Sequence, residues 1–326
     1  MQNQARWPLS RECTADEVTS ESGEAVSFVG TPVKVNGVAS LGEAMPNDIA
    51  FCAYEGERGI KAIGRSSAGI ILCKKSLYSV VTPKKNQQLI FSENPRLAFV
   101  RFVNRRTPDK VPPARVSATA VIDPTARLGR DCVVGEHAVI GKGCVLGDRV
   151  VVDARCTLQN CSVGDGSSIQ SGTVIGSDGF AYERYSDGSL ERFPHFGRVI
   201  IGRNVEICAN CSIARGSLQD TVIGDNAKLD ALVHMAHNVQ IGEYCQLAAG
   251  TIIGGSTTLG RSCWTGLNST LKNHVTLGDN VLVAAGACVI ADVPDGDVVA
   301  GVPAKSIKAK VKTDEMFIMT GKTLPT

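Results

Sequence analysis

Aromatic residues are scarce in this chain of 326 residues, at 5% of the total, and only two of them are tryptophan. So few bulky rings argue against an interior built on large side chains. Charge of one sign is also lacking, because 34 Lys and Arg oppose 32 Asp and Glu and leave a formal net charge of +2. With no basic excess and no basic stripe, we expect no binding to nucleic acid.

Long apolar runs are missing as well. No stretch approaches the roughly 18 apolar residues of a membrane-spanning helix, so we expect no stable insertion into a membrane. The first 24 residues are mostly polar and carry several acidic side chains, which is typical of neither a signal peptide nor a transit peptide. We therefore expect residues 1–24 to be a disordered tail and the protein to be cytoplasmic.

The chain does have an aliphatic residue at every sixth position over long stretches, with Thr265 as the one polar exception. The frame consists of Ile122, Leu128, Val134, Ile140, Leu146, Val152, Leu158, Val163, Ile169, Ile175, Ile201, Ile207, Ile213, Ile223, Leu229, Met235, Ile241, Leu247, Ile253, Leu259, Thr265, Leu271, Leu277, Val283 and Val289. Two excursions interrupt it, the larger over 177–198. This period matches neither an amphipathic helix nor an alternating strand, but it is typical of a parallel β-helix with one short strand and one corner per hexad. We predict a mainly β fold with such a β-helix over 116–307.

The fifth residue of each hexad is small in most repeats, and it should also point into the solenoid. Six of the twelve cysteines occupy this position: Cys132, Cys144, Cys156, Cys211, Cys245 and Cys263. Cysteine behaves there as a small hydrophobic residue, so we predict a packing role, no cofactor and, in a reducing compartment, no disulfides. The spacing of Cys208 and Cys211 is typical of a metal site, but no second such pair accompanies it.

Residues 25–115 lack the hexad frame and are expected to form a small α/β domain of the nucleotide-binding kind. Its strands should lie at 26–29, 48–52, 69–73 and 88–91, and a helix should cover 95–104 with Asn94 as its N-cap. The proline-rich segment 107–113 is expected to be a linker. Residues 308–326 should be a short tail, whose lysines are either a solvated helix or a contact for an acidic partner.

The chain has only five histidines: His137, His195, His234, His237 and His274. With three hexads per coil, His237 and His274 fall at the same corner two coils apart, about 10 Å along the axis, although His274 is one position beyond strict register. Gly255 follows His237 by one coil of 18 residues and should stack on it. A base and a backbone N–H suit acyl transfer to an amine, which needs a proton acceptor and a donor for the oxyanion. The alternative is that both histidines are edge residues of a purely structural prism.

Several segments resemble the UDP-3-O-(3-hydroxyacyl)glucosamine N-acyltransferase family of lipid A biosynthesis. They are Gly37–Leu41 with Asp48–Phe51, Ile175–Tyr182, Phe193–Gly202 and Ala236–Asn238. The resemblance covers 30–305, and the run GSDGF within Ile175–Tyr182 carries it most specifically.

This resemblance implies a left-handed β-helix and a homotrimer with active sites in clefts between neighbouring chains. It implies a 3-hydroxyacyl group on acyl carrier protein as the donor, and the 2-amino group of a UDP-linked, 3-O-acylated glucosamine as the acceptor. The family's general base falls on His237, its second histidine on His274 and its oxyanion glycine on Gly255. The residues expected to bind substrate are Phe51, whose ring would stack on uracil, and Asp178, Phe180, Tyr182, Asp230 and Asn238.

Other functions stay open at this point. One is a related hexapeptide acyltransferase that uses acyl- or acetyl-CoA and another amino sugar. A non-catalytic trimeric scaffold is favoured by Ala214 and Ala231, which replace residues usual in the family. A zinc carbonic anhydrase on the same solenoid would need three converging histidines, and its spacing is absent. At the level of residues, the alternatives are that Phe51 belongs to a core and that 177–198 is a plain hairpin extension.

Overall fold

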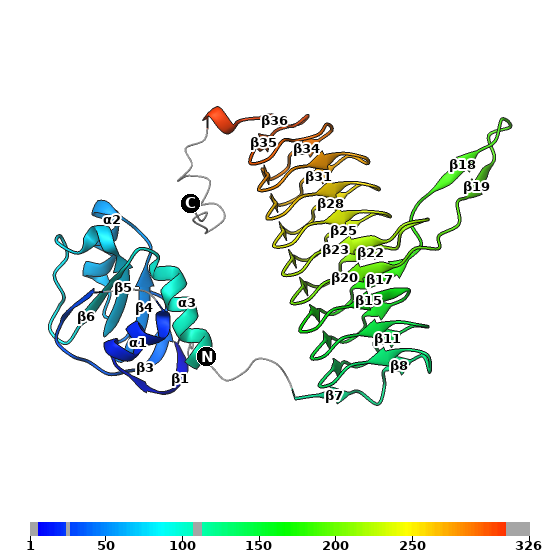
Figure 1. Ribbon diagram of the computed structural model, residues 1–326. Coiled ribbons are helices and arrows are strands. Elements are labelled where there is room, and N and C mark those ends of the chain that lie inside the picture. The colour runs from blue at the N-terminus through cyan, green and yellow to red at the C-terminus, as the bar shows by residue number, and fades with distance from the viewer. Residues whose placement is uncertain (1–5, 24–26, 107–112, 311–326) are drawn as a thin grey trace. The chain divides into compact units, whose positions relative to one another are not determined.

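The computed structural model describes residues 6–23, 27–106 and 113–310, which form two compact units that divide near residue 110 (Figure 1). The linker predicted at 107–113 and the end of the predicted tail, 311–326, lie almost entirely outside the described residues. The described helices include none that is long and apolar enough to cross a membrane.

The first unit is a six-stranded sheet in the order β1-β3-β4-β5-β6-β2 with helices on both faces. Its strands are β1 (Arg6–Cys13), β2 (Ser27–Gly30), β3 (Val35–Ala39), β4 (Asp48–Cys52), β5 (Ile70–Lys74) and β6 (Gln88–Ser92), and its helices are α1 (Ala15–Ser22), α2 (Gly56–Arg65), α3 (Pro95–Arg106) and the short η1 (Lys75–Leu77). Neighbours along β5 alternate between faces, so Ile70 packs with Phe102 of α3 while Ile71 packs with Ile63 of α2. The predicted α/β character and the four predicted strands are confirmed.

The helix predicted from residue 95 is also confirmed, and it runs to Arg106. The N–H of Leu97 donates to Asn94 Oδ1 at 3.1 Å, which is the expected N-cap bond.

The prediction of a disordered tail over 1–24 is wrong for the described part of that segment. β1 pairs antiparallel with β3, and α1 starts at a capping box formed by Thr14 and Glu17. Leu9 and Val18 are buried in the same cluster as Phe102. The segment has a polar composition because a strand and a helix that cover one face of a sheet need only a few apolar side chains.

The second unit is a solenoid of three parallel sheets, here called B, C and D. Sheet B contains β7 (Arg115–Val116), β10 (Val133–Val134), β13 (Val151–Val152), β16 (Ser168–Ile169), β21 (Glu206–Ile207), β24 (Lys228–Leu229), β27 (Gln246–Leu247), β30 (Trp264–Thr265), β33 (Leu282–Val283) and β35 (Val298–Ala300), and is closed by the antiparallel β36 (Lys305–Ser306). Sheet C contains β8 (Val121–Ile122), β11 (Val139–Ile140), β14 (Thr157–Leu158), β17 (Val174–Ser177), β22 (Ser212–Ala214), β25 (His234–Met235), β28 (Ile252–Ile253), β31 (Thr270–Leu271) and β34 (Cys288–Val289). Sheet D contains β9 (Arg127–Leu128), β12 (Val145–Leu146), β15 (Cys161–Val163), β20 (Val199–Ile201), β23 (Thr221–Ile223), β26 (Gln240–Ile241), β29 (Thr258–Leu259) and β32 (Thr276–Leu277). A short 3-10 helix, η2 (Lys308–Lys310), follows.

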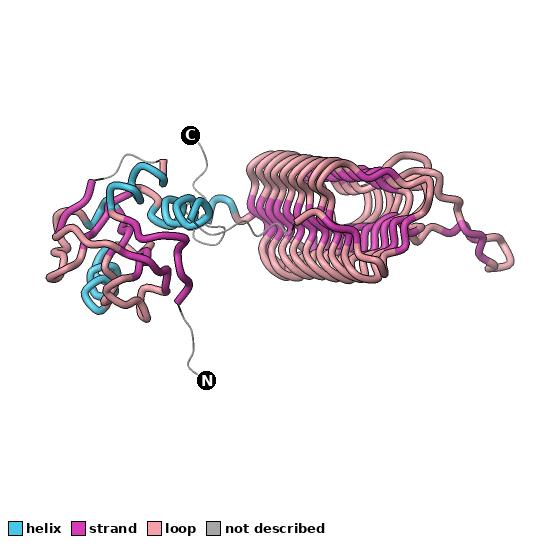
Figure 2. Tube along the Cα trace, turned by 90° about the horizontal axis from the view of Figure 1, so that it is seen from below, coloured by secondary structure: helices cyan, strands magenta, loops and turns pink. Residues whose placement is uncertain are grey.

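The coil length follows the hexad prediction. Partners in neighbouring strands of an uninterrupted coil are 18 residues apart, as Met235 is from Ile253. Figure 2 views the coils nearly end-on, and strand segments stack on strand segments while corners stack on corners.

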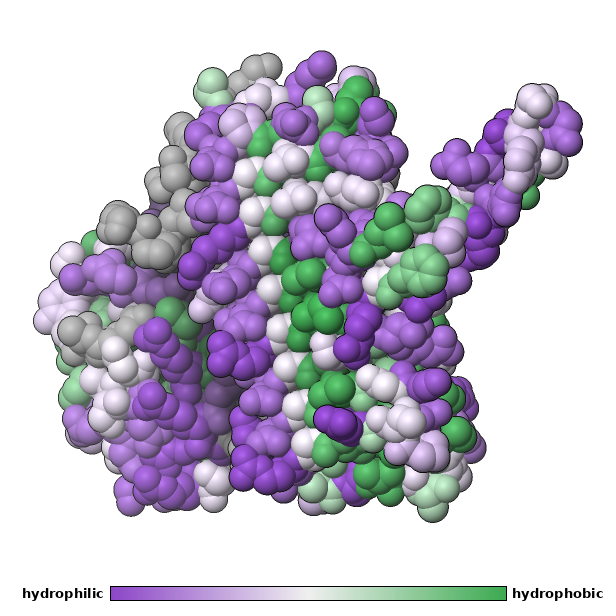
Figure 3. All heavy atoms as spheres, turned by 45° about the vertical axis from the view of Figure 1, so that its right-hand side comes forward, coloured by the Kyte–Doolittle hydropathy of each residue, from purple (hydrophilic) through white to green (hydrophobic). Residues whose placement is uncertain are grey.

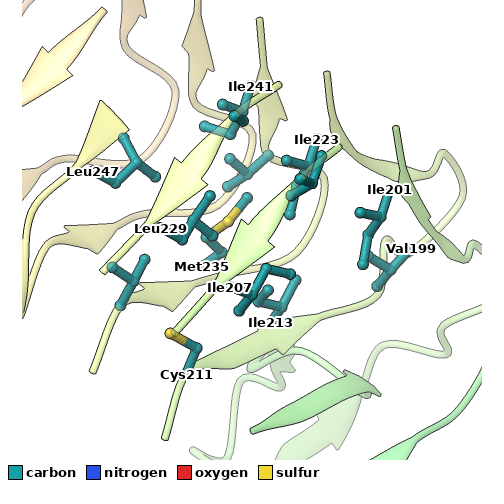
Figure 4. Packing of buried hydrophobic residues seen from close by; sticks show 14 of the residues in the cluster. Val199, Ile201, Ile207, Cys211, Ile213, Ile223, Leu229, Met235, Ile241 and Leu247 are labelled. Atoms are coloured by element: carbon teal, nitrogen blue, oxygen red, sulfur yellow. The ribbon is translucent and has the colours of Figure 1, made fainter. Parts of the chain in front are cut away.

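The inside of the solenoid is the predicted aliphatic stack, and Figure 4 shows its central part from Val199 to Leu247. From Val134 onward, every residue of the frame is at most 3% exposed, and Ile122 and Leu128 pack against its first coils. The six cysteines of the fifth position are all buried among them, which confirms their packing role.

One strand allows this packing to be measured against a matched neighbour. In β28, Ile253 points inward and is fully buried, whereas Ile252 points outward and is 47% exposed. We expect Ile253→Ala to reduce the free energy of unfolding by about 2–5 kcal/mol, because it leaves a cavity in a close-packed interior. Ile252→Ala should cost less than about 1 kcal/mol. Urea denaturation of both variants would contradict this description if the two losses were equal.

Both interruptions of the frame occur at one corner. The segment 177–198 leaves after β17 and rejoins at β20, and the shorter segment 215–220 joins β22 to β23. These are corners between sheets C and D in two successive coils, and the next corner in the stack, between β25 and β26, carries His237. The chain therefore concentrates its irregular structure next to one histidine.

Candidate active site

His237 lies at the corner between β25 and β26, and the coils above it place the other predicted residues in order. The N–H of Ser256 donates to the His237 carbonyl at 2.9 Å, and the N–H of His274 donates to the Gly255 carbonyl at 3.0 Å. His237, Gly255 and His274 therefore share one edge, as the repeat predicted. The one-position offset of His274 is also real, because it occupies the same left-handed turn position as Ser256, with φ near 60° in both.

The imidazole of His237 is held in one tautomer by Asn238. His237 Nδ1 lies 2.8 Å from Asn238 Oδ1, which also accepts hydrogen bonds from the N–H and the hydroxyl of Ser217 at 3.2 and 2.9 Å. The amide nitrogen of Asn238 donates to the Gln219 carbonyl at 3.0 Å, so the orientation of its amide is fixed. Nδ1 must therefore carry the proton, and Nε2 keeps its lone pair to accept one.

Two glycines flank the ring of His237. A Cβ on Gly255 would lie 2.8 Å from Cε1 and 2.9 Å from Nε2 of the imidazole, and a Cβ on Gly179 would lie 2.8 Å from its Cβ and Cδ2. The N–H of Gly255 makes no hydrogen bond to any residue that the structure describes. A proton acceptor and an uncommitted N–H donor therefore lie side by side, which is the pair that a tetrahedral intermediate of acyl transfer requires.

Gly179 reaches His237 because the long excursion folds back over the corner. Arg215 ties it down by donating from Nε to Asp178 Oδ1 at 2.8 Å and from Nη2 to the His195 carbonyl. Arg192 adds an ion pair with Asp178 at 3.6 Å. Asp178, which we expected to bind substrate, thus serves in this chain to anchor the excursion.

Beyond this anchor the excursion is a hairpin of β18 (Tyr182–Arg184) and β19 (Leu190–Arg192) that projects from the solenoid (Figure 1). Apolar side chains gather at its foot, as Figure 3 shows. Phe180 is 87% exposed and Phe196 72%, and the rings of Phe180 and Tyr182 are 5.1 Å apart. The excursion is therefore both a hairpin extension and the wall of the candidate site, and its exposed rings suit the apolar part of a ligand.

Two predicted residues are not brought to His237 within the chain. Asp230 lies at a different corner, between sheets B and C, where its carboxylate accepts the N–H of Ala231 at 2.7 Å. It borders a shallow cavity of about 240 Å³ with Lys228 and Trp264. Phe51 belongs to the first unit and is half-buried, with its ring centroid 4.9 Å from that of Phe99 in α3.

Four residues around the base were not singled out from the sequence: Gly179, His195, Arg215 and Ser217. Gly179 and His195 lie inside segments that carry the family resemblance, which was the only available signal. The described residues contain no group of three His, Cys, Asp or Glu side chains placed to hold a metal ion. Cys211 is buried in the core while Cys208 is half-exposed on the other side of the wall, so this pair does not converge.

Comparisons with known proteins agree with this geometry. Residues 33–105 match the family described as UDP-3-O-(3-hydroxymyristoyl) glucosamine N-acyltransferase, LpxD, and residues 220–255 match the bacterial transferase hexapeptide family. The UDP-3-O-acylglucosamine N-acyltransferases of Coxiella burnetii strains Dugway 5J108-111 and RSA 331 / Henzerling II are each 35% identical over 269 residues, which is 77% of this chain and 77% of theirs.

Solved structures support the fold. The UDP-N-acetylglucosamine O-acyltransferase of Moraxella catarrhalis is 22% identical with a TM-score of 0.56, covering 64% of this chain and 78% of that one. The UDP-N-acetylglucosamine acyltransferase of Francisella novicida is 25% identical, also with a TM-score of 0.56, and covers 64% and 74%. The solenoid is a left-handed β-helix of this kind. With the sequence identity to its relatives and the geometry around His237, this places the chain in the UDP-3-O-acylglucosamine N-acyltransferase family.

Proposed function

We propose that this protein transfers a 3-hydroxyacyl group from acyl carrier protein to the 2-amino group of a UDP-3-O-acylglucosamine, as a step of lipid A biosynthesis in the cytoplasm. The observation that carries the proposal is the pairing of His237, whose Nε2 is left as the proton acceptor, with the free N–H of Gly255. The names of the relatives supply the acceptor.

The chemistry assigns one task to each group. The amino nitrogen of the sugar attacks the thioester carbonyl of the donor, and His237 Nε2 takes the proton that the nitrogen loses. The N–H of Gly255 donates to the oxyanion that forms on the carbonyl oxygen. When the carbon–sulfur bond breaks, the proton passes from Nε2 to the leaving sulfur. An amide and a thiol are the products, and no cofactor is required.

The protein is proposed to act as a homotrimer. Asp230 lies at a different corner from His237, so the two can meet only if a neighbouring chain supplies one of them. Light scattering that shows a stable monomer at micromolar concentration would contradict the shared site.

A direct assay separates the donor alternatives. The protein would be incubated with UDP-3-O-acylglucosamine and a panel of 3-hydroxyacyl chains carried on acyl carrier protein or on CoA, with mass spectrometry of the product. We expect acylation of the amine from the carrier protein. Transfer only from CoA would change the donor, and no transfer from any pair would favour a scaffold without catalysis.

Phe51 is proposed to stack on the uracil of the acceptor. Phe51→Leu keeps an apolar side chain in the cluster but removes the ring, so we expect KM for the acceptor to rise about tenfold while kcat changes little. Phe99→Leu is the matched control, because it breaks the same ring contact from the other side. Equal effects of both variants, measured by steady-state kinetics and thermal unfolding, would show that Phe51 acts only in packing.

A further inference from the structure

His195 is a buried histidine without a hydrogen-bond partner. It is 4% exposed, and neither Nδ1 nor Nε2 makes a hydrogen bond within the described part of the chain. A neutral imidazole always has one N–H to donate and one lone pair to accept, and leaving both unpaired in an interior is unfavourable. An apolar side chain of the same shape would avoid this cost, so the imidazole requires another explanation.

The nearest aromatic partner of His195 is the proposed base. The ring centroids of His195 and His237 are 5.8 Å apart with an angle of 75° between the planes, which is an edge-to-face arrangement. Gly179 touches both rings, since a Cβ there would lie 2.9 Å from His195 Nε2 and 2.8 Å from His237 Cδ2. The backbone of His195 is fixed by the bond from Arg215 to its carbonyl. The main chain, rather than side-chain hydrogen bonds, therefore holds this ring against His237.

The surroundings keep His195 uncharged. Burial lowers the pKa of His195 below its usual value, and the carboxylate of Asp178 opposes this only in part. Asp178 is itself paired with Arg215 and Arg192. Of the other charged groups nearby, Asp220 accepts the N–H of Arg198. Because its folded pKa lies below that of a free histidine, His195 is neutral at neutral pH.

We propose that His195 is a positioning residue that acts through His237, by offering a neutral, polar ring to the imidazolium that His237 becomes when it accepts the proton. This inference rests on the proposed role of His237 as the base. An edge-to-face neutral imidazole presents the cation with either its π face or a ring lone pair, and both are attractive. Since no partner commits either nitrogen, His195 is free to take the tautomer that turns its lone pair toward the charge.

Burial also indicates that His195 does not bind substrate itself. Its ring nitrogens lie beneath Gly179 and the excursion, so a ligand at Nε2 of His237 would not touch them. A charged residue at this position would repel the imidazolium, and an aliphatic one would leave it against hydrocarbon.

The test compares two substitutions of different polarity. His195→Phe keeps a flat ring without nitrogens, and we expect kcat to fall about tenfold with KM nearly unchanged and thermal stability kept or raised. His195→Gln restores a neutral polar group that reaches the position of Nε2, and it should recover part of the loss. The control is His137→Asn, at an exposed left-handed corner where asparagine is well tolerated, and it should leave kcat unchanged.

A second readout does not depend on the substrate. Diethyl pyrocarbonate modifies neutral imidazoles, and peptide mass spectrometry reports the modification of His237 at each pH. In His195→Phe the imidazolium of His237 is less stabilised, so the midpoint of this curve should shift to lower pH by about half a unit or more. Inactive wild-type protein that still shows this shift would refute the proposed reaction and leave the role of His195 standing.

Two outcomes would overturn the proposal. One is a His195→Phe protein with wild-type kcat and an unmoved modification curve. The other is an equal loss of kcat in the Phe and Gln variants with no shift of the curve, because that result assigns His195 to packing alone.

Discussion

Replacing His237 with alanine is expected to lower kcat by about 10²- to 10⁴-fold, the range typical for the loss of a general base. Nε2 is the ring nitrogen that accepts the proton, because Nδ1 is committed to Asn238. The loss should appear in kcat rather than in KM, since the proton moves only in the transition state. The increase of rate with pH that a free imidazole produces should also be absent from the variant.

His274→Ala provides the comparison for this result. His274 is exposed and sits one position off the column of His237 and Gly255, so its proposed role is limited to orienting the donor and its loss should be milder. Thermal unfolding of both variants should match the wild type, because neither side chain belongs to the aliphatic stack. A His237→Ala protein that retains near-full turnover would refute the mechanism.

Gly255→Ala is expected to lower kcat by about 10²-fold through a single methyl group. The new Cβ would lie 2.8–3.2 Å from three atoms of the His237 ring, so the ring must move away. A displacement of this size pulls Nδ1 from Asn238 and takes Nε2 out of line with the N–H donor, and a misplacement of about 1 Å is enough to cost two orders of magnitude.

The matched control is Gly286→Asn. Gly286 is also a corner glycine of the solenoid, but it has φ of 67°, a conformation that asparagine tolerates, and a Cβ there meets nothing within 4 Å. Both variants should fold, as judged by circular dichroism, and only Gly255→Ala should lose activity. If the two variants kept equal activity, the packing of Gly255 on His237 would have no role in catalysis.

The solenoid was predictable because its repeat is local. Each coil touches only its two neighbours, so residues such as Met235 and Ile253 must recur at the coil length for their side chains to stack. The same register placed Gly255 on His237 without any knowledge of the structure. The strands of the first unit were found from their short apolar runs, but β1 and α1 were missed, because each contributes only a few buried side chains, such as Leu9 and Val18.

The rest of the site lies where the repeat stops. Gly179 and His195 belong to the excursion at 177–198, and Ser217 belongs to the shorter one, so no periodicity assigns them a place. Their positions depend on tertiary contacts such as the bond from Arg215 to the His195 carbonyl. The tautomer of His237 depends on Ser217 in the same way, because only the N–H of Ser217 fixes which atom of Asn238 faces the imidazole. Asp230 was predicted for this site but lies at another corner of the chain.

The position of β25 within sheet C bears on how the molecule comes apart. Three strands, β28, β31 and β34, lie on one side of it, and five, from β22 to β8, lie on the other. In a stack held by nearest-neighbour contacts, opening begins at the terminal coils and spreads inward. Fraying would thus consume the outer coils before it reached His237, and catalysis should outlast the first loss of secondary structure on heating.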